Sequence, residues 1–547
     1  MRRDLTRLTE TVFDLLIVGG GITGATLAWD ASLRGLKVAL IDKGDFGCAT
    51  SAATSKLIHG GLRYLKNGEV FLVRESLRER RIMQTIAGHL VRPIPFMVPT
   101  YKKGGNRKWL IKAGMIIYDL LSYDRKRLED PDQRIPRHYM LSADDVRGLE
   151  PGVSPEGLTG AAVYYDCQND PDRLTLEFIL GAQRNGAVIF NYVRATDLIC
   201  SLGRLESTRL EDLLSGQQIE VKARMVANVA GPWADQIDRL AGAESDSTLK
   251  RSQGIHLVTR PLVRKHAVVL QTSAGNHFFI IPYKGVSLIG TTDTEYTGKP
   301  DEVSVLDSDV HQFIDEINQA YPGAKLTEAD VKYRYIGMRP LIDQETQVYK
   351  ASRKYEIIDY HRRGIKGYIS ALGGKYTTSR NLARKLTDRI LARLDEPKVA
   401  CLTDKKLLPG SVSGSFTEYL KGCFERDGDL LPKDVFEHLV WTYGARHEDL
   451  LELVRSDSSL AQRLQPQRPE ILAQVVMAIE SELACTLADI LFRRTGLGVL
   501  GDPGRATMDM IVDLAARLLG WGSERKAREL DTCVKKIAGQ AEPAPLG

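Results

Sequence analysis

The cysteine pattern excludes several classes of protein. The seven cysteines are scattered and form no C-x-x-C pair; they are Cys48, Cys167, Cys200, Cys401, Cys423, Cys485 and Cys533. This spacing argues against an iron–sulfur or zinc site of the usual kind and gives no disulfide framework. We therefore expect reduced thiols, no metal and no internal electron relay.

Long apolar runs, a secretory signal and a large excess of one charge are also lacking. The longest apolar stretch, Trp109 to Leu121, contains Lys112 and is shorter than the roughly 20 residues that span a bilayer. Residues 1–12 are polar and too short for a signal peptide. A net charge of +5 over 547 residues gives no reason to expect nucleic-acid binding. The composition, 43% hydrophobic and 27% charged, is that of a globular protein with several domains.

The stretch from Phe13 to Asp42 predicts a dinucleotide-binding βαβ unit. An apolar run precedes Gly19, Gly21 and Gly24, which form a G-x-G-x-x-G pattern, and a second apolar run ends in Asp42. The first glycine allows the turn, the second lets a pyrophosphate approach, and the third lets helix and strand pack closely. The helix N-terminus offers free N–H groups to the phosphates, and the Asp42 carboxylate can accept from a ribose hydroxyl. NAD and FAD fit this stretch equally well.

The connection from residue 44 to residue 65 is long, rich in hydroxyl groups and without periodicity. Loops of that kind often carry function. Its hydroxyl and N–H groups could contact a cofactor, and Arg63 and Tyr64 could face a substrate. A solvated Ser/Thr loop is the alternative. Farther on, residues 91–101 contain three prolines and predict an edge strand that leaves the first domain.

Basic residues surround a predicted amphipathic helix near Trp109. They are Lys102, Lys103, Arg107, Lys108, Lys112, Arg125, Lys126 and Arg127. Apolar residues recur at helical spacing between them: Trp109, Ala113, Ile116, Ile117, Leu120 and Leu121. A basic helix with Trp at its edge fits a membrane interface. It fits packing on a protein core equally well, and the residues alone leave both interpretations open.

The second half of the chain predicts an antiparallel sheet and then a helical region. Short alternating strands are expected between residues 255 and 295. Two glycine turns follow apolar strands, one at Gly231 and one at Gly374, where Lys375 is adjacent. Beyond about residue 400 the pattern is helical. We read residues 401–547 as a separate helical domain.

Six strings distributed along the chain carry a resemblance to a known family. They are GGGITGA at Gly19, CATSAATSKLIHGGLRYL at Cys48, NVAGPWAD at Asn228, LIGTTD at Leu288, GMRPL at Gly337 and GGKYTTSR at Gly373. Together they resemble the FAD-dependent glycerol-3-phosphate dehydrogenases of the respiratory, aerobic type, over nearly the whole chain. SKLIHGGLRYL is the most specific string, because amine oxidases of the same superfamily carry a different sequence there. FRRTGLGV at Phe492 also fits the family.

The resemblance implies an α/β (overall α+β) fold with a Rossmann-type FAD domain of D-amino-acid-oxidase-like architecture. An antiparallel substrate-domain sheet and a C-terminal helical domain complete the expected fold. The FAD-binding domain is expected to be discontinuous, from residues 12–95, 155–257 and 335–400. The substrate domain, with the basic membrane-interface segment, is expected from residues 96–154 and 258–334. The resemblance also favours the membrane interface for the helix near Trp109.

The same resemblance implies contacts to FAD. The pyrophosphate is expected at the first glycine turn, the ribose at Asp42, the isoalloxazine near the hydroxyl-rich loop and the adenine near the backbone of Val193. The expected cofactor-binding residues are Gly19, Gly21, Ile22, Thr23, Gly24, Asp42, Thr50, Ser51, Ser55, Lys56, Val193, Gly231, Gly374, Lys375 and Thr377.

Roles in substrate binding and catalysis are carried over from matching family positions. Arginine forks suit a phosphate dianion, which assigns Arg63, Arg339 and Arg353 to the substrate, with a hydrogen bond from Tyr64. His256 is the preferred base, because its ordinary pKa of about 6.5 leaves it neutral at neutral pH. Arg339 would hold the developing alkoxide. Lys375 would stabilise charge or act as the base.

Two details qualify the role of His256. The family commonly has Gly-Ser-His at this position, whereas this chain has Gly254-Ile255-His256, so a local hydroxyl is missing. A structural histidine in the core is the alternative interpretation.

The expected reaction is oxidation of sn-glycerol 3-phosphate to dihydroxyacetone phosphate. Electrons would pass to ubiquinone or menaquinone. The protein would be peripheral on the cytoplasmic face of the cell membrane, or else cytoplasmic, and a homodimer is also considered. One alternative is an oxidase that uses O₂, although the chain lacks the insertion that soluble family oxidases carry. Another is a non-catalytic flavin-binding subunit of a membrane complex.

Overall fold

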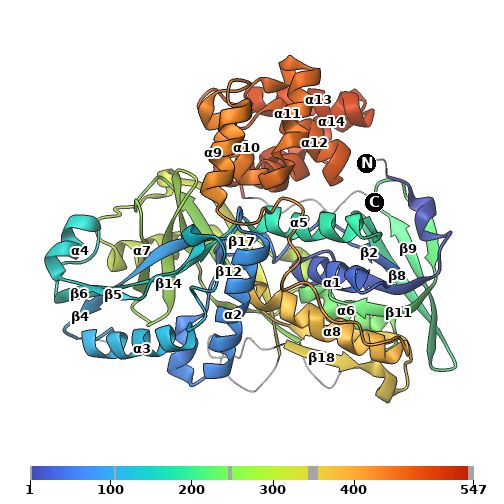
Figure 1. The fold of residues 1–547 in the computed structure, drawn as a ribbon, viewed down its shortest axis with the longest axis horizontal. Coiled ribbons are helices and arrows are strands. Elements are labelled where there is room, and N and C mark those ends of the chain that lie inside the picture. Colours follow the sequence, from blue (N-terminus) through green and yellow to red (C-terminus); the bar gives the residue numbers. More distant parts are fainter. Residues whose placement is uncertain (1–2, 104–105, 244–248, 343–354, 540–547) are drawn as a thin grey trace.

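The βαβ unit predicted at Phe13–Asp42 forms the centre of a six-stranded sheet, on the right in Figure 1. The computed structural model describes residues 3–103, 106–243, 249–342 and 355–539. In spatial order the strands are β18 (Tyr355–Asp359), β19 (Tyr368–Gly373), β11 (Ala223–Asn228), β1 (Phe13–Val18), β2 (Val38–Ile41) and β7 (Val188–Phe190). All neighbours are parallel except β18 and β19. The carboxyl ends of β1, β2 and β11 therefore meet at one edge, where ligands of such sheets bind.

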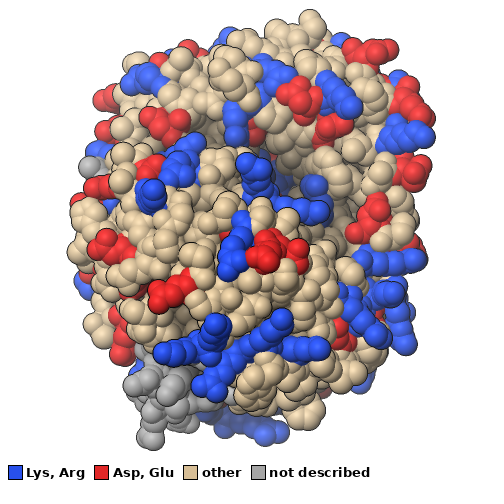
Figure 2. Space-filling model, turned by 90° about the vertical axis from the view of Figure 1, so that its left-hand side faces the viewer, with Lys and Arg blue, Asp and Glu red and all other residues tan. Residues whose placement is uncertain are grey.

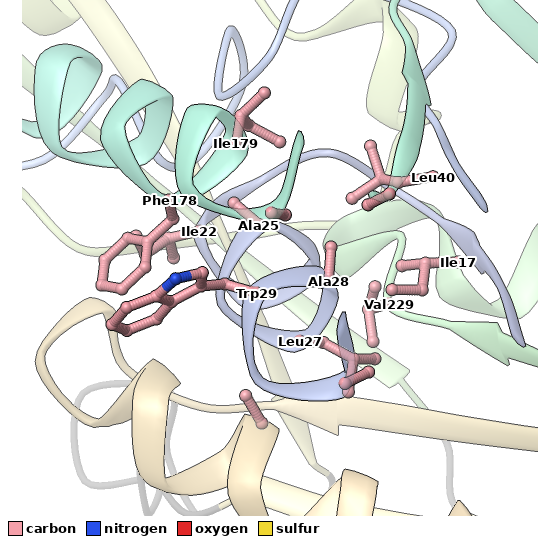
Figure 3. Packing of buried hydrophobic residues seen from close by; sticks show 14 of the residues in the cluster. Ile17, Ile22, Ala25, Leu27, Ala28, Trp29, Leu40, Phe178, Ile179 and Val229 are labelled. Atoms are coloured by element: carbon pink, nitrogen blue, oxygen red, sulfur yellow. The ribbon is translucent and has the colours of Figure 1, made fainter. Parts of the chain in front are cut away.

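Helix α1 (Ile22–Leu33) is buried between this sheet and helices α5 (Pro171–Arg184) and α8 (Ser379–Arg393). Its small residues Ala25 and Ala28 are fully buried and allow this close approach. Figure 3 shows Trp29 of α1 against Phe178 of α5, with the ring centroids 5.3 Å apart. Burial of each large apolar side chain stabilises the fold by roughly 1.5–3 kcal/mol. The helix that begins the dinucleotide motif is thus fixed from three sides.

The second sheet lies on the left in Figure 1 and carries the expected antiparallel strands. Its order is β16 (Thr294–Tyr296), β12 (Leu249–Thr259), β15 (Val286–Gly290), β14 (His277–Tyr283), β13 (Ala267–Gln271), β4 (Arg92–Tyr101), β6 (Leu158–Gln168) and β3 (Leu57–Ile58). Two further strands pair off this path, β17 (Val331–Ile342) with β12 and β5 (Tyr139–Leu141) with β6. A separate three-stranded sheet contains β10 (Gln218–Val221), β9 (Arg204–Asp212) and β8 (Val193–Ser201).

The proline-rich strand β4 corrects one prediction, because it lies inside the sheet and not at its edge. It pairs with β6 along its whole length and with β13 at Phe96 and Met97. Pro93, Pro95 and Pro99 occupy alternate positions, so their missing N–H groups all face the same side of the strand. Strand β4 can therefore keep a full set of backbone pairings with β6 on one side, while its pairing with β13 on the other side is short.

The remaining helices of the two sheet-containing regions lie at their surfaces. They are α2 (Val70–Ile86), α3 (Lys108–Leu121), α4 (Ala143–Leu149), α6 (Ala234–Leu240) and α7 (Asp307–Ala320). Strands β6 and β12 belong to the second sheet although they fall within the range 155–257 expected for the FAD-binding domain. Sheet membership thus divides the chain more finely than the predicted ranges, and the division into domains remains a prediction.

The C-terminal helices form a bundle at the top of Figure 1. They are α9 (Phe416–Asp427), α10 (Lys433–Tyr443), α11 (His447–Ser456), α12 (Leu472–Glu482), α13 (Arg505–Leu519) and α14 (Ser523–Ile537). A π-helical turn, η12 (Asp489–Arg494), lies between α12 and α13. Buried ion pairs join Glu482 to Arg173 of α5 and to Arg446. The pair with Arg173 therefore docks the bundle on α5, beside the six-stranded sheet, and Leu483 adds an apolar contact to the core of that region.

Candidate functional site

A cavity of about 1850 Å³ runs along the carboxyl edge of the six-stranded sheet, between the second sheet and the C-terminal bundle. Typical ligand pockets measure about 300–1,000 Å³, so this one has room for a dinucleotide and a small substrate together. Among the predicted site residues that the structure describes, all except Gly24 line this cavity. Arg353 lies outside the described residues.

The glycine turn forms the nucleotide end of the cavity. Gly19 has φ +115°, and a Cβ atom there would lie 2.7 Å from the carbonyl oxygen of Val229. A Cβ atom on Gly24 would lie 1.8 Å from the Gly19 carbonyl, so Gly24 serves helix–strand packing. Gly21, Ile22 and Thr23 line the cavity at the N-terminus of α1. This turn without side chains, followed by free helix N–H groups, fits a pyrophosphate.

Asp42 lies at the end of β2, beside this turn. Its carboxylate accepts from the N–H of Gly20 at 2.6 Å and from that of Gly44 at 2.8 Å. Burial raises the pKa of Asp42 to about 6 despite these two donors. The carbonyl of Asp42 accepts from the N–H of Val193 at 2.8 Å, which brings the expected adenine end next to the expected ribose end. The acid therefore also orders the glycine turn, and its contact to a ribose remains a prediction.

The hydroxyl-rich loop joins the two sheets. Ser51 accepts from the N–H of Ile22 at 2.9 Å, and Thr50 donates to the carbonyl of Met338 on β17 at 2.6 Å. The Tyr335 hydroxyl, also on β17, donates to the carbonyl of Thr54 at 2.7 Å. The loop is therefore built into the wall between the two sheets and is no solvated surface loop.

The ammonium of Lys56 is buried at the end of the same loop. It lies 3.5 Å from the carboxylate of Asp172. Its predicted contact to the cofactor therefore has to coexist with this ion pair.

His256 lines the part of the cavity where the reaction is expected, which we call the reacting end. It lies on β12 between Gly290 and Tyr335, and its ring stacks on that of Tyr335 with centroids 4.8 Å apart. A Cβ atom on Gly290 would lie 2.2 Å from the ring. Nε2 lies 2.9 Å from the hydroxyl of Ser55, whereas Nδ1 has no hydrogen-bond partner among the described residues.

The protonation state of His256 follows from its surroundings. Only 1% of the residue is exposed. Burial, then Arg339 and Lys56, hold its pKa well below 6.5, so the imidazole is neutral at physiological pH. Ile255 belongs to a core cluster on the opposite face of the strand. The hydroxyl group that contacts the imidazole therefore comes from Ser55 in the loop, and not from the residue that precedes His256 on β12.

Arg339 lies on β17, close enough to His256 to affect its pKa. Its guanidinium donates to Asp293 at 3.0 Å, to the Thr291 hydroxyl at 2.8 Å and to the Thr292 carbonyl at 3.3 Å. A Cβ atom on Gly254 would lie 2.6 Å from this guanidinium. The GMRPL and LIGTTD strings thus build one positively charged position beside the imidazole.

A second cationic group lies across the cavity, where the turn after β19 meets η2 (Leu62–Asn67). The Lys375 ammonium lies 3.8 Å from the centre of the Tyr64 ring, and the Arg63 guanidinium lies 5.1 Å from it. Burial, together with nearby Arg63, lowers the pKa of Lys375. The structure thus brings Lys375 next to Arg63 and Tyr64, which precede it by more than 300 residues in the sequence. Their chemistry suits a phosphate dianion.

His59 is a cavity residue to which the sequence assigned no role. Burial, together with nearby Lys375 and Arg63, lowers its pKa to about 4. The adjacent Gly60 donates its N–H to the hydroxyl of Tyr118 at 3.1 Å and to the carboxylate of Asp166 at 3.2 Å. The string IHGGLRYL contained the signal, since a glycine is required where a Cβ atom would lie 2.3 Å from the Tyr118 oxygen.

Basic residues also border the cavity near the C-terminal bundle: Arg334, Arg525, Arg528, Lys535 and Lys536. Figure 2 shows one face of the molecule, on which Lys and Arg side chains gather around a hollow. Such a distribution attracts anionic ligands toward the protein.

Comparisons with known proteins identify the family of this chain. Residues 14–389 match the family described as FAD dependent oxidoreductase, and residues 401–526 match the C-terminal domain of alpha-glycerophosphate oxidase. A glycerol-3-phosphate dehydrogenase of Synechocystis is 36% identical over 96% of this chain and 97% of its own length. An aerobic glycerol-3-phosphate dehydrogenase of Bacillus subtilis is 32% identical over 99% of this chain and 97% of its own length.

Solved structures give the same result. The glycerol-3-phosphate dehydrogenase of Bacillus halodurans complexed with FAD matches with a TM-score of 0.81 and 26% identity, over 98% of this chain and 97% of that one. An FAD-bound L-alpha-glycerophosphate oxidase of Mycoplasma pneumoniae shares the fold, with a TM-score of 0.54 over 73% of this chain and 99% of that one. The predicted fold class and the predicted FAD cofactor are confirmed. The chain belongs to the FAD-dependent oxidoreductases of the glycerol-3-phosphate dehydrogenase family.

Proposed function

We propose that the protein oxidises sn-glycerol 3-phosphate to dihydroxyacetone phosphate. The observation that carries the proposal is the meeting of a neutral, buried imidazole with two separate cationic groups in one cavity beside the dinucleotide turn. A phosphorylated secondary alcohol needs these elements: a phosphate clamp, a base for the hydroxyl proton and a positive charge near the developing alkoxide. The relatives named as glycerol-3-phosphate dehydrogenases support the choice of substrate.

The protein's own residues divide the work as follows. FAD, when bound, supplies the two-electron acceptor. The imidazole of His256 takes the C2 hydroxyl proton, for which its depressed pKa keeps it unprotonated. Arg339 stabilises the alkoxide as negative charge develops, and its bonds to Asp293 and Thr291 keep it in place beforehand.

The phosphate is assigned to the opposite cationic group. Arg63 offers a fork of donors, Lys375 a compact charge, and Tyr64, whose ring lies next to both cations, a hydroxyl. Burial of Lys375 strengthens its attraction for a dianion, because the local dielectric is low. Arg353, outside the described residues, remains a predicted member of this group.

We further propose a quinone as electron acceptor and a membrane surface as the place of reaction. The support is helix α3, whose buried residues include Ile111, Met115 and Tyr118. The opposite face of α3 exposes Trp109 (67%), Leu120 (68%), Ile116 and Ile117, and the basic residues flank it. Leu110, Ala113, Gly114 and Ile117 also line the cavity, so an apolar path leads from this face inward. None of the helices within the described ranges is long and apolar enough to cross a membrane.

The test is anaerobic reduction of the bound flavin by a panel of phosphorylated polyols and 2-hydroxy acids. Bleaching of the yellow protein by glycerol 3-phosphate, without nicotinamide, is the expected result. Bleaching by a different member of the panel alone would reject the substrate, and a flavin that ignores every member would reject the dehydrogenase function. The name of the C-terminal family match makes an oxidase the second candidate. Peroxide yield, compared with reduction of a quinone analogue, distinguishes the two acceptors.

A further inference from the structure

Two segments meet at the nucleotide end of the cavity. One is the loop from Asp42 to Asp45 after β2, and the other is Tyr192–Val193 at the start of β8. The N–H of Val193 donates to the carbonyl of Asp42 at 2.8 Å, and that of Tyr192 donates to the carbonyl of Gly44 at 3.1 Å. Tyr192 has φ +55°, a conformation that costs energy for a residue with a side chain. Both segments therefore need support from elsewhere.

The support for the first segment comes from the C-terminal domain. The carboxylate of Asp45 accepts two bonds from Arg494, at 2.7 and 2.9 Å, and another from Nε of Arg493. It also accepts from the side-chain amide of Asn191 at 2.9 Å. Burial would raise the pKa of Asp45, but the two guanidinium groups outweigh burial and hold that pKa well below its usual value. The carboxylate is charged and has four donors.

The support for the second segment comes from the same turn, η12. The hydroxyl of Tyr192 donates to the carboxylate of Asp489 at 2.6 Å. Asp489 also accepts from Arg493 and from the backbone N–H groups of Cys485 and Thr486, at 2.8 and 3.0 Å. Asp489 is fully buried. One side chain of the C-terminal domain thus fixes the residue next to Val193.

The π-helical turn η12 contributes two consecutive arginines, Arg493 and Arg494, to one partner. In this turn both guanidinium groups reach Asp45. π-Helical turns are rare and are found frequently at functional sites. Arg493 and Thr486 themselves line the cavity.

We propose that the C-terminal domain is part of the FAD site: η12 positions the Asp42–Asp45 loop and Tyr192–Val193, and so determines how tightly FAD is held. Asp45, Asp489, Arg493 and Arg494 are positioning residues in this proposal, and the bonds of Asp42 and Val193 transmit their effect. The inference concerns the cofactor, so it is independent of the substrate and of the electron acceptor.

The first experiment compares two tyrosines that each lose one buried hydroxyl. Tyr192→Phe removes the bond to Asp489, whereas Tyr443→Phe removes the 3.1 Å bond from Gln474 inside the C-terminal domain, away from the cavity. FAD is removed and the apoprotein is titrated with FAD, following the quenching of flavin fluorescence. The dissociation constant should rise about tenfold for Tyr192→Phe, equivalent to about 1.4 kcal/mol, and stay unchanged for Tyr443→Phe. An unchanged constant for Tyr192→Phe would overturn the proposal.

The second experiment separates cofactor positioning from domain docking. Arg494→Met breaks the pair with Asp45, and Arg446→Met breaks another buried contact between the domains, the pair with Glu177 of α5, together with the pair to Glu482 inside the C-terminal domain. Both variants should unfold at lower temperature than the parent. Only Arg494→Met should weaken FAD binding, by tenfold or more. An equal loss of FAD affinity in both variants would mean that FAD binding depends on docking of the whole C-terminal domain and not on η12, which would overturn the proposal. Should Arg494→Met fail to fold, the tyrosine pair decides alone.

Discussion

The two ends of the cavity are built in different ways. The nucleotide end is formed mainly by glycines and backbone N–H groups from the single stretch between Gly19 and Asp42. At the reacting end, side chains from separate strands and turns converge: His256, Arg339 and Lys375 come from β12, β17 and the turn after β19. The first end depends on the absence of side chains, and the second depends on their charge. A substitution at the nucleotide end should therefore lower the FAD content, whereas one at the reacting end should lower kcat/KM and leave the FAD content unchanged.

The largest effect is expected from Gly24→Ala. The added methyl group would lie 1.8 Å from the Gly19 carbonyl, so β1 and α1 must separate and the turn must deform. We expect purified protein with almost no FAD, measured as flavin absorbance per chain. Gly148→Ala is the control, because α4 has open space there and alanine favours a helix. A full flavin content with unchanged thermal stability for Gly24→Ala would contradict the interpretation.

Arg339→Met should have the reverse signature. FAD content should stay normal, while kcat/KM for glycerol 3-phosphate should fall roughly 10²–10³-fold, as expected when one charge-stabilising donor is lost. Arg260→Met, directly after the neighbouring strand β12 and outside the cavity, removes a similar charge that pairs with Asp330. It should leave kcat/KM within about twofold of the parent. Near-normal turnover by Arg339→Met would exclude its assigned role.

The pH dependence of turnover tests the imidazole at the reacting end. The pKa of His256 lies well below 6.5, so lowering the pH through 6.5 does not protonate it, and the base form persists. We expect kcat at saturating substrate to show no break near pH 6.5 and to fall only in more acidic solution. A break near 6.5 that disappears in His256→Asn would show an ordinary histidine pKa.

The smallest effect is expected where the reacting end approaches the surface. Leu120→Ser on α3 removes an exposed apolar side chain, which should weaken binding to vesicles with anionic lipids by roughly tenfold. Turnover with a soluble acceptor should not change. Leu202→Ser, fully exposed between β8 and β9, is the matched control and should bind vesicles normally. Equal binding by both variants would remove α3 from the interface.

The difference between the two ends also explains what sequence alone could predict. The glycine turn, α1 and Asp42 follow from contacts within 30 residues, and their local pattern was sufficient. Arg339 and Lys375 were found through resemblance, since their surroundings come from distant strands. The interior position of β4 was missed, because proline statistics describe one strand and say nothing about its neighbours. The contact of Asp45 with Arg494 joins residues 449 positions apart and leaves no local pattern.

Helix α3 and the substrate side of the cavity share one side chain. The hydroxyl of Tyr118, on the buried face of α3, donates to Asp166 at 2.8 Å and accepts from the N–H of Gly60, three residues before Arg63. A displacement of α3 therefore displaces the start of the segment that carries Arg63 and Tyr64. Thermodynamic linkage between two such sites is reciprocal. If α3 contacts a surface and Arg63 binds the substrate, any effect of one contact on the affinity of the other is returned by the same factor, and a surface that strengthened substrate binding would itself be bound more tightly by the substrate-bound protein.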